Sequence, residues 1–177
     1  EDIEHLMIGP ILHDEPILAN NEVLFYGQAI AAVLAETHDQ AKKAALLVQA
    51  KIEELEAVVT VEQALEKKSF LDDPIVVSTG DSQTAIKKAK NTLNGTLSIG
   101  GQEHYYLEGQ VAISIPTEDN EMVVHSSTQN PTEVQHLVAH VLDVPQNAIE
   151  VVTRRMGGGF GGKETDSSQL ACICAIF

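Results

Sequence analysis

A glycine-rich stretch near the end of the sequence, RRMGGGFGGKE at 154–164, carries residues whose spacing could hold a ligand. Gly157, Gly162 and Lys163 match the spacing of a P-loop, but the position that needs Ser or Thr is Glu164. In a P-loop that hydroxyl binds Mg²⁺ beside the phosphates, and a carboxylate in its place would repel them. The stretch is therefore not expected to bind ATP or GTP.

The glycines of this stretch also match G-x-G-x-x-G, the pattern of dinucleotide-binding loops. That pattern belongs after the first strand of a βαβ unit, whereas this one follows a predicted hairpin and helix late in the chain. Glycines let backbone N–H groups approach a ligand closely, and a helix that follows adds the positive end of its dipole. We therefore expect the loop to hold an anionic or oxo-rich group, with a plain tight turn as the alternative.

Two other pairs of residues have the spacing of metal ligands. His136 and His140 are four apart on a predicted helix, but Leu137 stands where the H-E-x-x-H motif has its Glu, so surface histidines are expected. Cys172 and Cys174 lie in the apolar run LACICAIF, which favours buried thiols over half of a tetrahedral metal site. The sequence also lacks the G-x-S-x-G motif of a serine nucleophile.

The first part of the chain is predicted to combine one strand with short helices. The apolar stretch 23–36 is typical of a glycine turn followed by a buried strand. Capping boxes predict two helices, which begin after Thr37 and Thr60. A third helix is predicted over 81–90.

The elements that must position the glycine loop follow in order. Alternating apolar residues predict a strand over 104–115, and 122–127 is expected to return beside it. Asn130 is a strong N-cap for the next helix. Its apolar stripe consists of Val134, Leu137, Val138, Val141 and Leu142. A strand at 149–153 then leads into the loop. The helix after the loop has apolar residues at helical spacing at Leu170, Ile173, Cys174 and Phe177.

Composition excludes several classes of protein. A net charge of −15 argues against a nucleic-acid surface, because phosphate binding draws on clustered Lys and Arg. No apolar run approaches the ~20 residues that span a bilayer, so no membrane partner is expected. Two cysteines are too few for a disulfide scaffold and favour a reducing, cytoplasmic location. The chain begins without Met and ends inside an apolar run, so we expect a fragment of a longer protein.

Three stretches resemble segments of the xanthine oxidase and aldehyde oxidase family of molybdenum hydroxylases, in the same order and at fitting separations. They are GGQEHYYLEGQ at 100–110, SSTQNPTEVQHLVAHVL at 126–142 and RRMGGGFGGKE at 154–164. Nearer the N-terminus, VLFYGQAIAAVLAETHDQAKKAA and VTVEQAL resemble the family's hammerhead domain. The resemblance implies an α+β fold, with a hammerhead-like α/β domain at 1–80 and the beginning of a molybdenum-cofactor-binding domain at 81–177.

The resemblance also implies roles for individual residues. Gln129 matches the glutamine that hydrogen-bonds the oxo ligand of the molybdenum, and Phe160 matches an aromatic residue among the molybdenum-site contacts. Gly159 and Gly161 would bring the loop backbone close to the ligands of the metal. Glu164 matches the glutamate that binds a purine, and it favours the xanthine branch because aldehyde oxidases typically have no acidic residue there. The family's catalytic glutamate and substrate-binding arginine match no residue here, so the chain alone is expected to be inactive.

The implied reaction is the hydroxylation of hypoxanthine and xanthine to urate at a molybdenum–molybdopterin cofactor, with water as the oxygen source. Electrons would leave through Fe–S clusters and FAD, on other domains or subunits, to NAD. An oligomeric enzyme is expected. Two alternatives stay open: another molybdenum hydroxylase that oxidises aldehydes or other N-heterocycles, and a non-catalytic interaction module.

Overall fold

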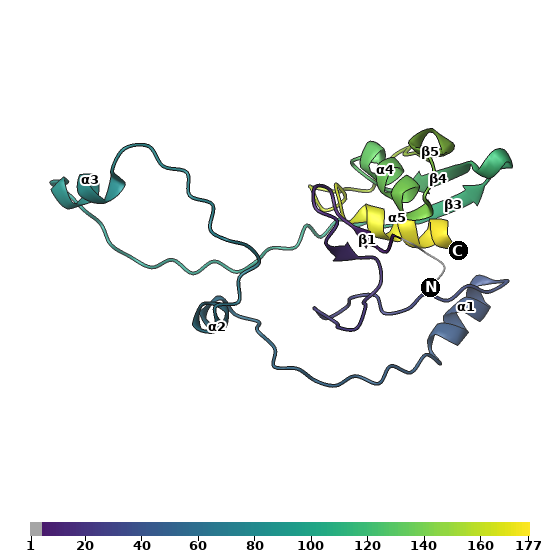
Figure 1. The fold of residues 1–177 in the computed structure, drawn as a ribbon, viewed down its shortest axis with the longest axis horizontal. Helices are drawn as coiled ribbons and strands as arrows, with labels where there is room; N and C mark the ends of the chain where they lie inside the picture. Colours follow the sequence, from purple (N-terminus) through teal and green to yellow (C-terminus); the bar gives the residue numbers. More distant parts are fainter. Residues whose placement is uncertain (1–4) are drawn as a thin grey trace. The chain divides into compact units, whose positions relative to one another are not determined.

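The computed structural model describes residues 5–177 and divides the chain into two units. Among these residues, one unit combines 5–48 with 102–177, and the other consists of residues 49–101 (Figure 1). The domain boundary expected near residue 80 falls inside the second unit and stays a prediction. No helix within residues 5–177 has both the length and the apolar character needed to cross a bilayer.

A three-stranded sheet forms the centre of the first unit. The middle strand β4 pairs antiparallel with β3 and parallel with β5, so the sheet order is β3-β4-β5. The parallel pair needs a crossover, which α4 supplies. The elements are β3 (Ala112–Pro116), η1 (Glu118–Asn120), β4 (Met122–Ser126), α4 (Pro131–Leu142), η2 (Gln146–Ala148), β5 (Ile149–Val152) and α5 (Ser167–Ile176).

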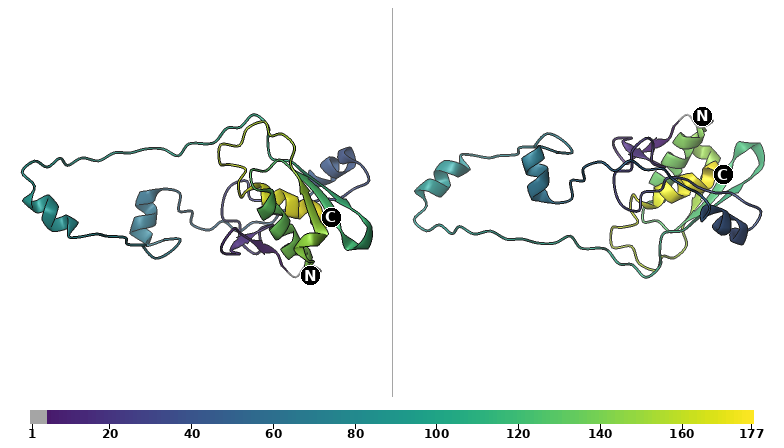
Figure 2. Two further views of the ribbon diagram at one scale, coloured as in Figure 1. Left: turned by 90° about the horizontal axis from the view of Figure 1, so that it is seen from above. Right: turned by 90° about the horizontal axis from the view of Figure 1, so that it is seen from below.

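The two long helices cover one face of this sheet, as Figure 2 shows from two sides. Side chains alternate across a strand, so Val124 of β4 points into this layer and is fully buried. It packs with Val134 and Val138 of α4, and with Ala171 of α5. Burial of such side chains contributes about 1.5–3 kcal/mol each, which makes this layer the main source of stability in the unit.

Helix α4 begins where the sequence predicts. The Asn130 side chain accepts a hydrogen bond from Glu133 N, and Pro131 occupies the first turn, where its missing N–H is harmless. Four residues of the predicted apolar stripe are buried and the fifth is partly buried. Asp143 ends the helix in the left-handed region with φ of 52°.

Helix α5 forms as predicted, and small residues make up most of its buried face. Its buried side chains are those of Ser167, Ser168, Ala171, Cys172 and Ala175. The four apolar residues expected at helical spacing lie on this helix, and they are not its buried face: three are partly buried, and Phe177 is 54% exposed. Small residues face α4 and the sheet because they let the helix axis approach closely, which periodicity alone does not reveal. Cys172 is buried as expected, and burial raises the pKa of its thiol to about 12.

The predicted strand at 23–36 does not form. This stretch pairs with no strand in the part of the chain that the structure describes, and Leu24 and Leu34 are about two-thirds exposed. A strand needs a hydrogen-bonded partner, so apolar sequence alone does not create one. The two capping boxes do form, and they begin α1 (His38–Ala45) and α2 (Val61–Lys67).

The second unit holds α2 and α3 (Ser82–Lys88), which Figure 1 shows joined by extended chain. Asp81 caps α3 by accepting a hydrogen bond from Thr84 N. Neither helix buries a residue, because the described part of this unit offers no second layer for their apolar sides. Local capping therefore determines where these helices begin without producing a core.

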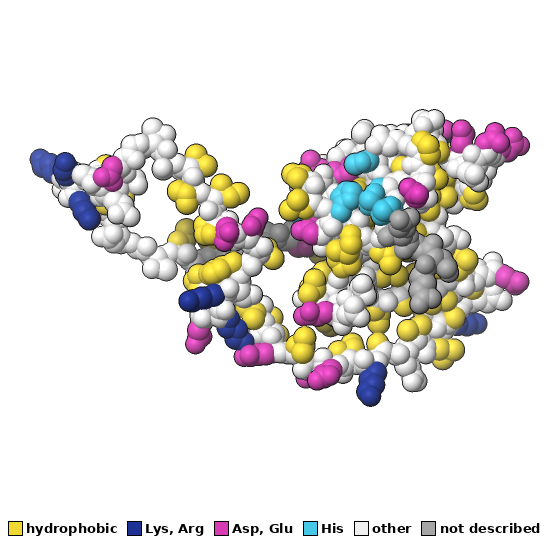
Figure 3. Space-filling model, viewed as in Figure 1, with side chains coloured by type: hydrophobic (Ala, Val, Ile, Leu, Met, Phe, Trp, Pro, Cys, Tyr) yellow, Lys and Arg dark blue, Asp and Glu magenta, His cyan; other side chains and the backbone are white. Residues whose placement is uncertain are grey.

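The N-terminal segment packs on α4 through histidines. The short strands β1 (Met7–Ile8) and β2 (Glu15–Pro16) pair antiparallel, and Ile8 of β1 and Ile17, directly after β2, are buried in the core of the unit. The ring of His140 lies 4.5 Å from that of His5 and 4.3 Å from that of His13, centroid to centroid. Figure 3 shows this histidine group near α4. His136 is a surface residue as predicted, whereas His140 is partly covered.

Replacement of His140 by Gln should reduce the acid sensitivity of the protein. Burial, followed by the proximity of His13, His5 and His136, lowers the pKa of His140 below its ordinary value of 6.5. A base with a lowered folded-state pKa binds fewer protons when folded, so stability is lost as the pH falls from 6.5 through the folded-state pKa. Thermal unfolding midpoints between pH 7.5 and 5.5 should fall less in His140→Gln than in the wild type.

The matched control is His38→Gln, which changes an exposed histidine of α1. It should keep the pH dependence of the wild type. An identical slope in His140→Gln and the wild type would contradict the assignment.

Candidate cofactor-binding site

The glycine loop, residues 154–166, connects β5 to α5 and lies against two other segments of the same unit. The first is 104–110, which the sequence predicts as part of a strand. That prediction is wrong for these residues: only Ala112–Pro116 forms strand, and Tyr105 has φ of 51°. The backbone of this segment instead hydrogen-bonds to the glycine loop: Glu108 N donates to Gly157 O at 3.3 Å. Gln110 Nε2 donates to Gly162 O at 3.3 Å.

The second segment, 126–130, places Gln129 in the loop. The side-chain oxygen Oε1 of Gln129 accepts hydrogen bonds from Gly161 N at 2.9 Å and from Lys163 N at 3.3 Å. Only the oxygen of a carboxamide can accept from N–H, so these contacts determine the orientation of the amide. The Nε2 group donates to no residue within 5–177 and is left as a free donor at the loop.

Close approach explains a glycine at position 159. A Cβ atom there would lie 2.6 Å from Gln129 Oε1, well inside contact distance. Gly161 has φ of 96°, a region that residues with side chains rarely adopt. The sequence-predicted residues Gln129, Gly159 and Gly161 are thus brought together.

Phe160 lies at the tip of the loop and is 76% exposed. Its backbone has φ of 53°, which is uncommon for an aromatic residue and strains the chain at this point. The edge of its ring lies 3.1 Å from the position that a Cβ on Gly158 would take. The aromatic side chain is therefore presented to solvent from a sharply turned backbone.

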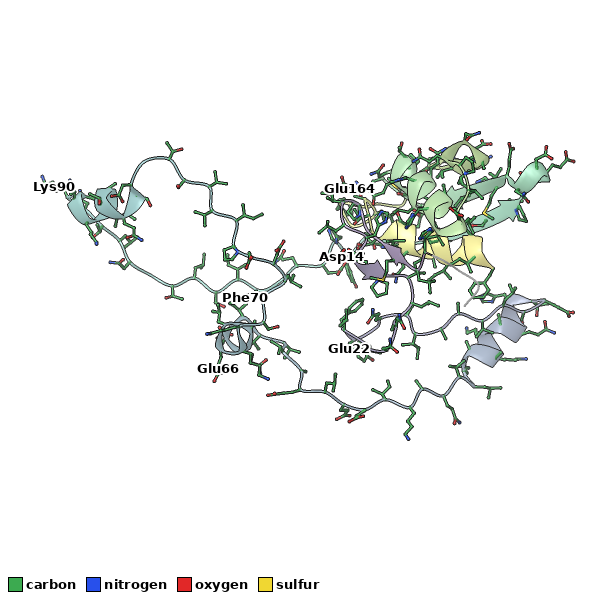
Figure 4. The ribbon with its side chains drawn as sticks, in the orientation of Figure 1. Asp14, Glu22, Glu66, Phe70, Lys90 and Glu164 are labelled. Carbon is green, nitrogen blue, oxygen red and sulfur yellow. The ribbon has the colours of Figure 1, made fainter. Side chains whose placement is uncertain are left out.

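Glu164 lies near the end of the loop and is exposed, as Figure 4 shows. Its carboxylate influences Glu133 in the first turn of α4. Burial, and then the negative charges of Glu164 and Glu15, raise the pKa of Glu133. One Glu133 oxygen, Oε1, is buried without a hydrogen-bond partner among the described residues. This side of the loop therefore offers carboxyl groups that can accept N–H bonds or hold a proton.

The buried side chain of Lys163 holds the loop in place. The sequence analysis did not predict this role. Its side chain is fully buried, with Nζ 3.0 Å from Glu108 Oε1 and 2.9 Å from Ser127 Oγ. The ammonium also lies 4.8 Å from the ring centroid of Tyr106. Ser127 Oγ donates to Glu108, and this bond, followed by the one from Lys163, lowers the pKa of Glu108.

These contacts fit a group rich in oxo or other acceptor oxygens. The N–H groups of Gly158, Gly159 and Phe160 donate to no residue in the described part of the chain, and Gln129 adds an amide donor beside them. Among residues 5–177, no three His, Cys, Asp or Glu side chains are arranged to hold a metal ion.

Comparison with known proteins also indicates a cofactor-binding domain. Residues 66–177 match the family model of the molybdopterin cofactor-binding domain. Residues 1–56 match that of the aldehyde oxidase and xanthine dehydrogenase a/b hammerhead domain.

Two curated relatives and one solved structure illustrate the similarity. The chain is 42% identical to a xanthine dehydrogenase from Dictyostelium discoideum over 95% of its length, and 44% identical to a nicotinate hydroxylase from Emericella nidulans over 95%. It spans only 12% and 13% of these two relatives. Quinoline 2-oxidoreductase from Pseudomonas putida 86 superimposes with a TM-score of 0.77 at 27% identity, over 92% of this chain and 22% of that one.

Two alanine substitutions in the loop should have different effects on stability. In Gly159→Ala the new Cβ meets the far end of the Gln129 side chain, which can move away. The free energy of unfolding should change by less than about 1 kcal/mol, but Gln129 should leave the loop. Hydrogen exchange should therefore become faster at the Gly161 and Lys163 amides.

Gly157→Ala is the contrasting variant. Its Cβ would lie 2.5 Å from Glu108 Cβ, which is attached to the backbone and cannot swing away. This substitution should cost about 1–3 kcal/mol in a denaturant titration. Equal destabilisation by the two variants would contradict the close-packing argument.

Proposed function

This chain belongs to the molybdopterin cofactor-binding domain family of aldehyde oxidases and xanthine dehydrogenases, and on that basis we propose that it is part of the molybdenum subunit of a xanthine dehydrogenase. The complete enzyme hydroxylates hypoxanthine and xanthine to urate, with water as the source of the oxygen. A molybdenum–molybdopterin cofactor supplies the redox chemistry when bound.

The observation that carries this proposal is the position of Gln129. Two loop amides hold its oxygen, so its amide nitrogen is directed to donate to an acceptor such as a metal-bound oxo group. The N–H groups of Gly158, Gly159 and Phe160, which donate to no residue within 5–177, lie in the same loop and are the proposed donors to further acceptor atoms of the cofactor. Phe160 adds an exposed aromatic face next to them.

Glu164 is the proposed substrate-binding residue. A carboxylate accepts hydrogen bonds from purine N–H groups or shares a proton with a ring nitrogen. The charge of Glu164 contributes to the raised pKa of Glu133, and Glu133 adds a second hydrogen-bond acceptor on the same side of the loop. An acidic pair of this kind suits a substrate rich in N–H donors better than a simple aldehyde.

The remaining parts of the reaction lie outside this chain. Electrons pass through Fe–S clusters and FAD, on other domains or subunits, to NAD. The full enzyme is an oligomer in the cytoplasm, with no nucleic-acid or membrane partner. The general base that the family resemblance implies matches no residue of this sequence, so the 177 residues alone are proposed to be inactive.

A second candidate is a related hydroxylase for another N-heterocycle. The 44% identity to a nicotinate hydroxylase and the fold similarity to a quinoline oxidoreductase both favour this alternative over a non-catalytic module. A pyridine ring offers a ring nitrogen to a protonated carboxyl, so Glu164 suits it through one shared proton.

Glu164→Ala in the full-length enzyme tests the substrate assignment. Loss of a hydrogen bond to a charged group should lower kcat/KM for xanthine by about 10- to 100-fold, measured as urate formation. Oxidation of an aromatic aldehyde by the same preparation should change little, since the aldehyde lacks the N–H groups. Glu150→Ala, an exposed acidic residue of β5, is the matched control.

The wild-type rates separate the candidates. A clear preference for xanthine over nicotinate and aldehyde supports the first proposal. A preference for nicotinate would favour the second candidate, and the absence of copurifying molybdenum would leave the non-catalytic module.

Gln129→Glu tests the donor role of the amide. The carboxylate can still accept from Gly161 N and Lys163 N, but it removes the donor and adds negative charge near the cofactor oxygens. Molybdenum content per subunit should fall by at least about tenfold, since a lost charged contact costs about 1.5–3 kcal/mol. The melting temperature should remain close to that of the wild type. Full occupancy in Gln129→Glu would rule out this donor role.

A further inference from the structure

We propose that Lys163 is the positioning residue of the loop: its buried ammonium fixes the backbone that orients Gln129 toward the cofactor. This inference rests on the proposed function and says which side chain holds the loop in its binding conformation. It concerns a side chain that touches neither substrate nor cofactor, because it is completely buried under the loop.

The side chain of Lys163 is held on three sides. Its ammonium donates to Glu108 and Ser127, and it lies over the ring of Tyr106. A buried charge is tolerated only where it is paired and hydrogen-bonded, so these partners determine where the ammonium can be. A cation over an aromatic face gains further attraction. The side chain thus has one stable position, at the junction of segments 104–110 and 126–130.

The backbone N–H and C=O of Lys163 both hydrogen-bond to Gln129, so the position of Lys163 determines how Gln129 is oriented. Lys163 N donates to Gln129 Oε1, and Lys163 O accepts from Gln129 N at 2.8 Å. The same carbonyl accepts from Thr128 Oγ1 at 3.1 Å and from Ser167 Oγ at 3.2 Å. One residue therefore links its own anchored side chain to both ends of Gln129.

The network is separate from the apolar core. Val124, Val138 and Ala171 are buried among themselves and their apolar neighbours. Glu108 is 40% exposed and can turn toward water if its partner is lost. We therefore expect removal of the ammonium to release the loop while the sheet and helices persist. A shape-matched apolar side chain, methionine, keeps most of the volume.

Lysine suits this position better than arginine. Its ammonium is compact and carries three donors, which match Glu108, Ser127 and the face of Tyr106. A guanidinium is larger and planar, and it would have to displace Ser127. Lys163→Arg therefore keeps the charge but not the geometry.

The test compares Lys163→Met, Lys163→Arg and Glu108→Gln in the full-length protein, with Lys42→Met, an exposed lysine of α1, as control. Two readouts are taken: molybdenum per subunit by elemental analysis, and hydrogen exchange of residues 157–164 in cofactor-free protein. Lys163→Met should lower molybdenum content by at least about fivefold and speed exchange in the loop by at least about tenfold. Its melting temperature should stay close to that of the wild type.

Coupling within the network gives a second criterion. Lys163→Met and Glu108→Gln break the same contact, so the double variant should lose no more molybdenum than Lys163→Met alone. Additive losses would overturn the inference, as would wild-type exchange in the Lys163→Met loop. A parallel fall of melting temperature and molybdenum would reduce Lys163 to a purely structural residue. If Lys163→Met does not fold, Glu108→Gln decides by the same two readouts.

Failure of the proposed function gives a different result. A wild-type protein without molybdenum overturns that function, whereas the exchange measurement on cofactor-free protein still judges the role of Lys163. A loaded wild type with an equally loaded Lys163→Met variant overturns this inference alone.

Discussion

A positive charge buried beneath a glycine loop is the constraint on which the candidate site depends. The ammonium of Lys163 has no contact with water, so it must lie where Glu108, Ser127 and Tyr106 can all reach it. Those partners come from two segments, one before and one after the β3–β4 hairpin, and the loop can form only when both are in place. The glycines serve this arrangement, because a side chain at position 157 would push segment 104–110 away and one at position 159 would displace the Gln129 side chain.

The surrounding fold supplies rigidity rather than chemistry. Strand β4 ends at Ser126, and α4 begins at Pro131, so Gln129 lies on a short connection between two well-packed elements. Such a connection has little freedom, since Asn130 caps the helix and Thr128 is fixed to Lys163 O. The amide of Gln129 can therefore present its donor without loss of much conformational entropy on binding.

The parts that could be predicted from the sequence are those with a local cause. Thr37, Thr60 and Asn130 begin helices where expected, because a cap and its partner are three residues apart. The stretch 23–36 and residues 104–111 were wrongly predicted as strand, because pairing depends on distant partners. Gln129, Gly159 and Gly161 meet as the family resemblance implies, whereas their roles at the cofactor remain predictions. Nothing local in the sequence indicates that Lys163 and Glu108 touch, since they are 55 residues apart.

That separation has a consequence for the order of folding. A contact between residues 55 apart closes a long loop of chain. The conformational entropy lost on closure opposes folding before the contact can stabilise the structure. The hairpin of β3 and β4 joins residues that are much closer along the chain. We therefore expect the β3–β4 hairpin to form early and the glycine loop to close later, together with the packing of α5 on β3, whose contacts span a similar length of chain. A cofactor that binds this loop would then bind only after the hairpin and α5 are both in place.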